Sequence, residues 1–187
     1  MTSSTRDPDP HRLDVAAFAA GGGELAGTWP ADRLTRLVAA TLAPLDGSAR
    51  PDIVWRASGE RRVLAGAGSQ PSLAVGAQTE VTLECQRCLQ PMRVALRAER
   101  RIFFVEGEQA AEALDAQNED DVLALTPALD LAPLIEDELL LALPLVPRHE
   151  QCPEPLPRGF VEDDAAVDPA EHPFAALAAL KRGPLPN

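Results

Sequence analysis

The stretch from Asp52 to Val105 constrains the fold most, because short β-prone runs follow one another there without a helical segment between them. Polar or glycine-containing pieces at 58–60 and 66–69, together with Gly76, separate these runs and are turn candidates. From Thr79 to Cys85 apolar and polar residues alternate, which is typical of a half-buried strand. Close spacing favours an antiparallel meander, with a barrel-like closure as its alternative. The expected strands are Ile53–Arg56, Arg62–Ala65, Ser72–Val75, Glu80–Glu84 and Val94–Val105.

Helical patterns flank this region and predict an α+β fold in which the sheet packs with two main helices. Apolar residues at three- and four-residue spacings predict the first helix between Pro30 and Pro44. The second begins after Asp130, a good N-cap, and ends before Pro144. The acidic stretch 106–121 is expected to be a mobile loop with at most a transient helical turn. Further short strands are expected at 13–15, 24–28 and 122–125.

The chain is expected to contain a single α+β domain at residues 11–152, after a disordered tail at residues 1–10. Residues 153–172 are acidic and rich in proline, which predicts a disordered linker, and residues 173–187 are expected to form a short helix and tail. The N-terminus lacks a signal-peptide pattern, and no apolar run reaches the roughly 18 residues of a membrane span. Three cysteines are an unsuitable number for a secreted disulfide scaffold. These features predict a cytoplasmic protein that does not contact a membrane.

Charge is distributed unevenly along this acidic protein, whose net charge is −12. Residues 51–103 carry eight arginines and five acids, whereas residues 104–187 carry four bases and eighteen acids. A protein that binds RNA non-specifically is expected to be basic, because neutralisation of phosphates drives that affinity. The pattern therefore favours a basic protein partner for the second half, and restricts direct RNA contact to the arginine-bearing middle.

The cysteine pair Cys85 and Cys88 is the sharpest local motif, since two thiolates at this spacing can chelate one zinc ion. His149 and Cys152 form a second chelating pair, and the four side chains together would complete a tetrahedral site. Two alternatives remain open: ordinary thiols at a strand end, or a redox dithiol. A redox dithiol usually requires a helix N-terminus to lower a thiol pKa, and the sequence around Cys85 is typical of a hairpin.

Arginines follow the cysteine turn and are candidates for RNA or partner binding, because the planar guanidinium suits phosphate. Arg93, Arg97 and Arg101 share one face of an extended strand, and Arg87 lies within the turn. The alternative interpretation is the solvated side of an amphipathic strand. The acidic residues 136–138 are interpreted as a solvated helix face. No glycine-rich phosphate loop or serine nucleophile elbow appears, so an enzyme is not expected.

Three stretches, taken in order, resemble the YceD-like family. Val81–Pro91 resembles its cysteine hairpin, Asp130–His149 its signature helix and proline-rich exit, and Pro173–Arg182 its closing helix. The resemblance implies a non-catalytic role in synthesis, processing or stability of large-subunit (23S) ribosomal RNA during ribosome biogenesis. It implies a ribosomal protein or the precursor large subunit as partner, with ribosomal RNA contacted directly or indirectly. Relatives with additional cysteines after the signature helix strengthen the zinc hypothesis. The alternatives to this role are a zinc-stabilised RNA-binding module and a redox thiol protein.

Overall fold

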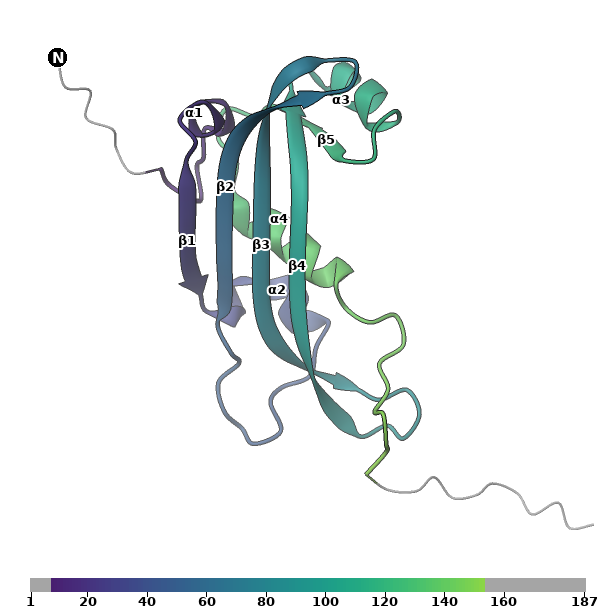
Figure 1. Cartoon of the computed structure of the whole chain (residues 1–187). Coiled ribbons are helices and arrows are strands. Elements are labelled where there is room, and N and C mark those ends of the chain that lie inside the picture. The colour runs from purple at the N-terminus through teal and green to yellow at the C-terminus, as the bar shows by residue number, and fades with distance from the viewer. Residues whose placement is uncertain (1–7, 154–187) are drawn as a thin grey trace, which may run out of the picture. The chain divides into compact units, whose positions relative to one another are not determined.

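A computed structural model describes residues 8–153 of the chain, which divides into two compact units, residues 1–150 and 151–187. The linker and closing helix expected after residue 153 lie outside the described residues. The described part of the first unit, residues 8–150, contains four α-helices, one 3₁₀ turn and five strands (Figure 1). In order, the elements are α1 (Val15–Ala20), β1 (Glu24–Trp29), the 3₁₀ turn (Ala31–Arg33), α2 (Thr35–Ala39), β2 (Ile53–Leu64), β3 (Gly68–Glu84), β4 (Pro91–Val105), α3 (Glu108–Asp115), β5 (Asp121–Ala124) and α4 (Leu131–Leu141).

The five strands form one sheet in the order β1-β2-β3-β4-β5. The first four are antiparallel neighbours, whereas β5 pairs in parallel with the end of β4, because the chain reverses through α3 before β5 begins. The sheet is therefore mixed and open, with β1 and β5 as its outer strands. The predicted α+β class and antiparallel meander are confirmed, and the barrel-like alternative is wrong.

The strands are longer than the sequence predicted, because two glycines that resemble turn signals lie inside strands. Gly59 belongs to β2, and Gly76 belongs to β3. A Cβ added to Gly59 would lie 2.5 Å from Cδ1 of Phe18, so this glycine leaves space for an aromatic ring of α1. A Cβ added to Gly76 would lie 3.1 Å from Nε of Arg56. These glycines make room for neighbouring side chains, and the chain does not turn at either.

The helices also differ from expectation outside α4. The helix expected from 30 to 44 is reduced to the 3₁₀ turn and the five-residue α2. Of the strand expected at 13–15, only Leu13 pairs, in an isolated antiparallel bridge with Leu129, and α1 begins at Val15. Asp14 caps α1 by accepting a hydrogen bond from the amide of Ala17 at 2.9 Å. The expected loop at 106–121 contains α3. The helix predicted after Asp130 is confirmed as α4, and Asp130 accepts from the amide of Ala132 at 2.9 Å.

One face of the sheet is buried against the helices, and the opposite face is open. Helices α2 and α4 lie behind the sheet in Figure 1, and α4 contributes Leu131, Ile135 and Leu139, each at most 1% exposed. Trp29 and Trp55 stack at 4.5 Å between ring centroids within this core. Residues of β2 alternate between buried and exposed from Ile53 to Glu60. This alternation aims every second side chain of the central strands away from the helices.

We predict that Gly59→Ala destabilises the protein by about 1–3 kcal/mol, the usual cost of overpacking a core. The added methyl group meets the ring of Phe18 and the backbone nitrogen of Ala19 at 3.0 Å, and backbone cannot easily move. Gly76→Ala is the matched control, since it meets only the flexible side chain of Arg56. Denaturant unfolding of both variants measures the difference. Equal stabilities would show that Phe18 does not fix this position.

Candidate functional site

The turn between β3 and β4 carries the cysteine pair. Its closure comes from two backbone hydrogen bonds: the amide of Cys85 donates to the carbonyl of Gln90 at 3.0 Å, and the amide of Leu89 donates to the carbonyl of Cys85 at 2.8 Å. Leu89 has a positive φ of 58°, which tightens the turn. Cys85 is fully buried, and Cys88 is half-buried. The hairpin thus presents both sulfurs from adjoining positions.

The segment that follows α4 lies against this turn. The amide of Gln86 donates to the carbonyl of Pro147 at 2.8 Å, and Arg87 donates to the carbonyl of His149 at 3.1 Å. The Cys88 sulfur lies 3.4 Å from Nδ1 of His149. Arg87, a predicted binding residue, therefore holds the two segments together through its guanidinium.

Burial raises the pKa of the Cys85 thiol, but three backbone amides act in the opposite direction. The amides of Cys88, His149 and Arg87 donate toward the sulfur, and the net result lowers the pKa of Cys85 from 9.0 to about 5. The contact from His149 is 3.4 Å long. Hydrogen bonds to the charged form favour the thiolate, which is the form that binds metals. We call these three amide donors around the Cys85 sulfur the amide cage. The sequence did not predict it, because His149 lies more than 60 residues from Cys85 along the chain.

The geometry brings together the four predicted ligands, Cys85, Cys88, His149 and Cys152. Their ligand atoms all lie within 4.8 Å of one another. In a tetrahedral zinc site with bonds of about 2.3 Å, ligand atoms are about 3.8 Å apart, so modest closure around an ion would satisfy this geometry. Three thiols and one imidazole are a donor set typical of structural zinc. The residues present could therefore hold a metal ion that ties the β3–β4 turn to the segment after α4.

The predicted arginines of β4 share the open face of the sheet. The register places Arg93 opposite Thr82, Arg97 opposite Gln78, and Arg101 opposite Ala74. Two of them are engaged with acids: Arg93 lies 3.3 Å from Asp46 and 3.8 Å from Glu80, and Arg97 lies 2.9 Å from Glu99. Strand β2 adds Arg56, which pairs with Glu99 at 2.7 Å and was not predicted from the sequence.

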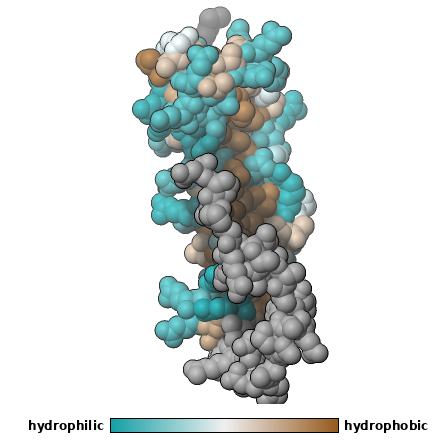
Figure 2. Space-filling view, turned by 90° about the vertical axis from the view of Figure 1, so that its right-hand side faces the viewer, coloured by the Kyte–Doolittle hydropathy of each residue, from teal (hydrophilic) through white to brown (hydrophobic). Residues whose placement is uncertain are grey.

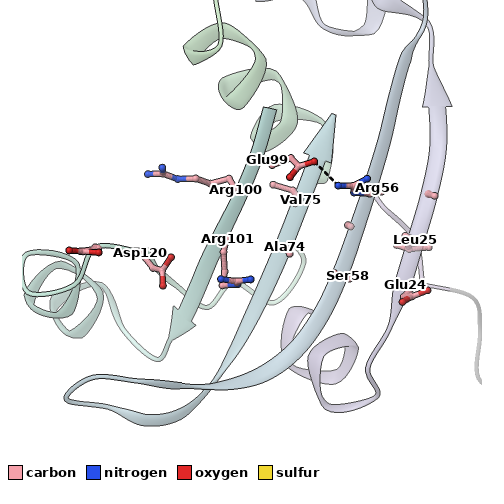
Figure 3. Close-up of a pocket in the computed structure, with 13 residues that line it drawn as sticks. Glu24, Leu25, Arg56, Ser58, Ala74, Val75, Glu99, Arg100, Arg101 and Asp120 are labelled. Atoms are coloured by element: carbon pink, nitrogen blue, oxygen red, sulfur yellow. Dashed lines mark hydrogen bonds and ion pairs between the residues drawn. The ribbon is translucent and has the colours of Figure 1, made fainter. Parts of the chain in front are cut away.

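Arg101 borders a hollow of about 860 Å³ on this face. Figure 3 shows Arg101 and Asp120 on one side of it and Glu24 on the other, with the small residues Ser58 and Ala74 between them. The register aligns Glu24, Ser58, Ala74 and Arg101 in one row across four strands. Nε of Arg101 is buried and has no hydrogen-bond partner among the described residues. Of the three arginines on this face of β4, Arg101 is the one without an ion pair within residues 8–153.

The acidic residues 136–138 differ from the expected solvated face. Glu136 is 7% exposed and accepts hydrogen bonds from the amides of Arg36 at 2.6 Å and Leu37 at 3.1 Å. The Arg36 guanidinium also contacts Glu136 at 2.9 Å and forms an ion pair with Asp137. Glu138 is half-buried, and burial raises its pKa. The trio is thus partly structural, because Glu136 caps the N-terminus of α2 from α4.

Within residues 8–153, no helix combines the length and the apolar character that crossing a membrane requires. The longest helix, α4, has 11 residues.

The fold defines a small α+β protein with an open mixed sheet. Its candidate site is a Cys/His cluster that brings together the β3–β4 turn and the segment after α4. A family model described as "Large ribosomal RNA subunit accumulation protein YceD" matches residues 73–181, which include this turn, α4 and the candidate ligands. The chain belongs to this family, and the predicted resemblance is confirmed.

A curated relative from Haemophilus influenzae carries the same description, "Large ribosomal RNA subunit accumulation protein YceD". It is 37% identical over 110 residues, which make up 56% of this chain and 62% of the relative. The match thus spans less than two thirds of the relative's length. No solved structure matches the chain.

We predict that Glu136→Gln destabilises the protein by about 1–3 kcal/mol, because it removes the charge from a buried acceptor of two amides and one guanidinium. Asp137→Asn is the matched control on the same helix, since the Asp137 side chain is 52% exposed and its ion pair is screened by water. Thermal or denaturant unfolding compares the two variants. An equal loss in both would contradict the capping role of Glu136.

Proposed function

We propose that the protein is a non-catalytic ribosome-biogenesis factor that supports synthesis, processing or stability of the large-subunit (23S) ribosomal RNA. In this proposal it acts in the cytoplasm by binding a ribosomal protein or the precursor large subunit. Membership of the family supports the pathway. The kind of partner is inferred from the charges of the chain, which are considered next.

The excess of acidic over basic residues carries this proposal, although Glu136 and Asp137 are paired with Arg36, and Asp121 with Arg100. Residues 104–150 contain twelve acids and one arginine, and they include α3, β5 and α4. On the open face of the sheet, Arg56, Arg93 and Arg97 are already paired with carboxylates. A surface of this kind repels phosphate and attracts basic protein segments. A protein partner therefore fits this charge pattern better than an RNA backbone.

Both histidines of residues 8–153 are engaged in other contacts. His149 lies 3.4 Å from the Cys88 sulfur, and in this proposal both side chains are metal ligands. His11 is held by Asp130 at 2.9 Å and by Arg33 at 2.8 Å, and no serine, threonine or cysteine contacts its ring. These assignments support a binding protein, because a histidine that ligates a metal, or one that is held by a carboxylate and a guanidinium, is not available as a general base.

In the same proposal, zinc is a structural element of the protein. Cys85, Cys88, His149 and Cys152 would hold the ion, and its role would be to keep the β3–β4 turn attached to the segment after α4. The amide cage around Cys85 supports this role, because it stabilises a thiolate. A redox role fits less well, since the Cys85 sulfur is buried and a redox thiol must be accessible to its oxidant.

Direct RNA binding is the second candidate function, and the common face of Arg93, Arg97 and Arg101 favours it. Arg101 is its strongest element, because its guanidinium has no ion pair among the described residues. Each arginine that contacts a phosphate releases about one counterion from the RNA. Because few arginines of this face lack an ion pair, the affinity for RNA would depend only weakly on salt concentration.

The first functional prediction concerns association with ribosomal precursors. The tagged full-length protein is expected to co-sediment with large-subunit precursors in a sucrose gradient, and its deletion is expected to lower 23S ribosomal RNA. Affinity purification followed by identification of bound protein and RNA names the partner. A protein that stays at the top of the gradient, with unchanged ribosomal RNA after deletion, would refute the proposal.

Arg97→Glu combined with Arg101→Glu separates the two candidate functions. If a protein partner mediates binding, co-sedimentation is expected to persist in this double variant. Loss of co-sedimentation together with loss of RNA crosslinking, in a variant that still folds, would favour direct RNA binding.

The second functional prediction concerns the metal. Protein purified without chelators is expected to contain about one zinc ion per chain, and His149→Ala or Cys88→Ser is expected to lower this content well below one. Chelation is expected to lower the melting temperature, because metal binding stabilises the folded state. His11→Ala is the control, since His11 contacts Asp130 and lies outside the cluster. Zinc-free protein with an unchanged melting temperature on chelation would reject the site.

A further inference from the structure

The two sides of β4 are paired to very different extents. On one side, the thirteen residues Pro91–Phe103 pair with β3. On the other side, β5 pairs only with the four residues Ile102–Val105. Among residues 8–153, no strand pairs with the outer edge of β4 from Pro91 to Arg101. In Figure 1, β5 lies beside only the upper end of this edge, and the end of α4 and the segment after it are drawn to the right of its lower part.

An edge of this length is an unusual feature of a folded protein. Eleven residues of strand span about 36 Å, and every second residue directs its backbone N–H and C=O groups outward. Such groups form hydrogen bonds with another strand when one is available. The edge is therefore an interaction surface, and its sequence determines which strand fits.

The sequence of the free edge suits a second copy of the same chain. The segment 91–101 is centred on Leu96, so an antiparallel two-fold arrangement places Leu96 opposite Leu96 of the second copy and uses all eleven residues. We propose that the protein forms a symmetric dimer in which the outer edges of β4 pair in this register and join the two sheets. The other opposed pairs are Val94 with Ala98, Ala95 with Arg97, Arg93 with Glu99, Met92 with Arg100, and Pro91 with Arg101.

Charge complementarity on the open face selects this register. Arg93 faces Glu99 of the second copy, and symmetry repeats the contact, so two cross-strand ion pairs form. No like charges are directly opposed. A shift of the centre to Arg97 would oppose Arg97 to itself and Arg93 to Arg101, and all these contacts would be repulsive. A shift to Ala98 would leave only seven residues to pair, because β5 occupies the edge from Ile102 onward.

The side chains needed for these ion pairs are accessible. Arg93 already lies 3.3 Å from Asp46 and 3.8 Å from Glu80 of its own chain, so its guanidinium would be shared with Glu99 of the second copy. Arg93 and Glu99 are more than half exposed, at 57% and 52% of their side-chain surface. Glu99 contacts Arg56 at 2.7 Å and Arg97 at 2.9 Å, so these two arginines hold its carboxylate in place. Orientation before binding lowers the entropy cost of association.

The opposite side of this edge offers apolar surface to the second copy. Figure 2 looks at the molecule from the β4 side and shows a hydrophobic stripe between hydrophilic margins in the upper half of the view. Met92 and Val94 of β4 are half-buried, and Leu141 at the end of α4 is 79% exposed. The end of α4 emerges beyond β4 in Figure 1. A two-fold axis at Leu96 places both α4 ends on the same side of the joined sheet, where they cover this stripe.

Sedimentation equilibrium of the full-length protein tests the dimer. The mass is expected to approach twice the chain mass of 19.9 kDa at high concentration and to fall toward 19.9 kDa on dilution. Glu99→Arg opposes arginine to arginine at two positions and is expected to weaken dimerisation by roughly tenfold or more. The double variant Arg93→Glu with Glu99→Arg restores opposite charges and is expected to recover the dimer. Circular dichroism verifies that each variant folds.

Arg97→Ala is the matched control, because it faces only Ala95 of the second copy and leaves Glu99 oriented by Arg56 at 2.7 Å. It is expected to leave the dissociation constant within about threefold of the wild type, which is under 1 kcal/mol. A mass of 19.9 kDa at every concentration would overturn the proposal. An unchanged dimer in Glu99→Arg, or no recovery in a folded double variant, would overturn this register.

Discussion

The pairing of β3 with β4 is the constraint on which the rest of the structure depends. Thirteen consecutive residue pairs fix one register, and a shift of one residue would move every side chain of β4 to the opposite face. This register puts Arg93, Arg97 and Arg101 on the open face, closes the cysteine turn at one end, and places the start of β5 at the other. The candidate metal cluster and the arginine face are thus two consequences of a single hairpin.

Features that depend on local pattern or ligand chemistry could be predicted from the sequence. The alternation from Thr79 to Cys85 indicated a half-buried strand, and the structure places these residues in β3 and at its end. The capping residue Asp130 and the following apolar spacing indicated α4. Cys85, Cys88, His149 and Cys152 could be grouped because they form two pairs with the same gap of two residues, and the structure brings their ligand atoms within 4.8 Å of one another.

Features that depend on contacts between distant segments could not be predicted. Gly59 has the same local sequence signal as a turn glycine, and only the position of Phe18 shows that it belongs inside a strand. Glu136 resembles a solvated helix residue until Arg36 and Leu37 approach it from α2. In the same way, Arg56 joins the open face only through the register of β2 with β3. Each case requires knowledge of which elements are neighbours in space.

The unpaired segment of β4 is fixed at both of its ends by contacts with other parts of the protein. At Pro91 the strand leaves the cysteine turn, which Arg87 and the amide of Gln86 fasten to the segment after α4. At Ile102 the strand enters its pairing with β5. A strand held at both ends, and paired with β3 throughout, has little conformational freedom left to lose when another strand joins it. The cysteine turn and the proposed dimer edge are therefore physically linked: a metal ion in the cluster would fix the end of the strand from which the second copy is recognised.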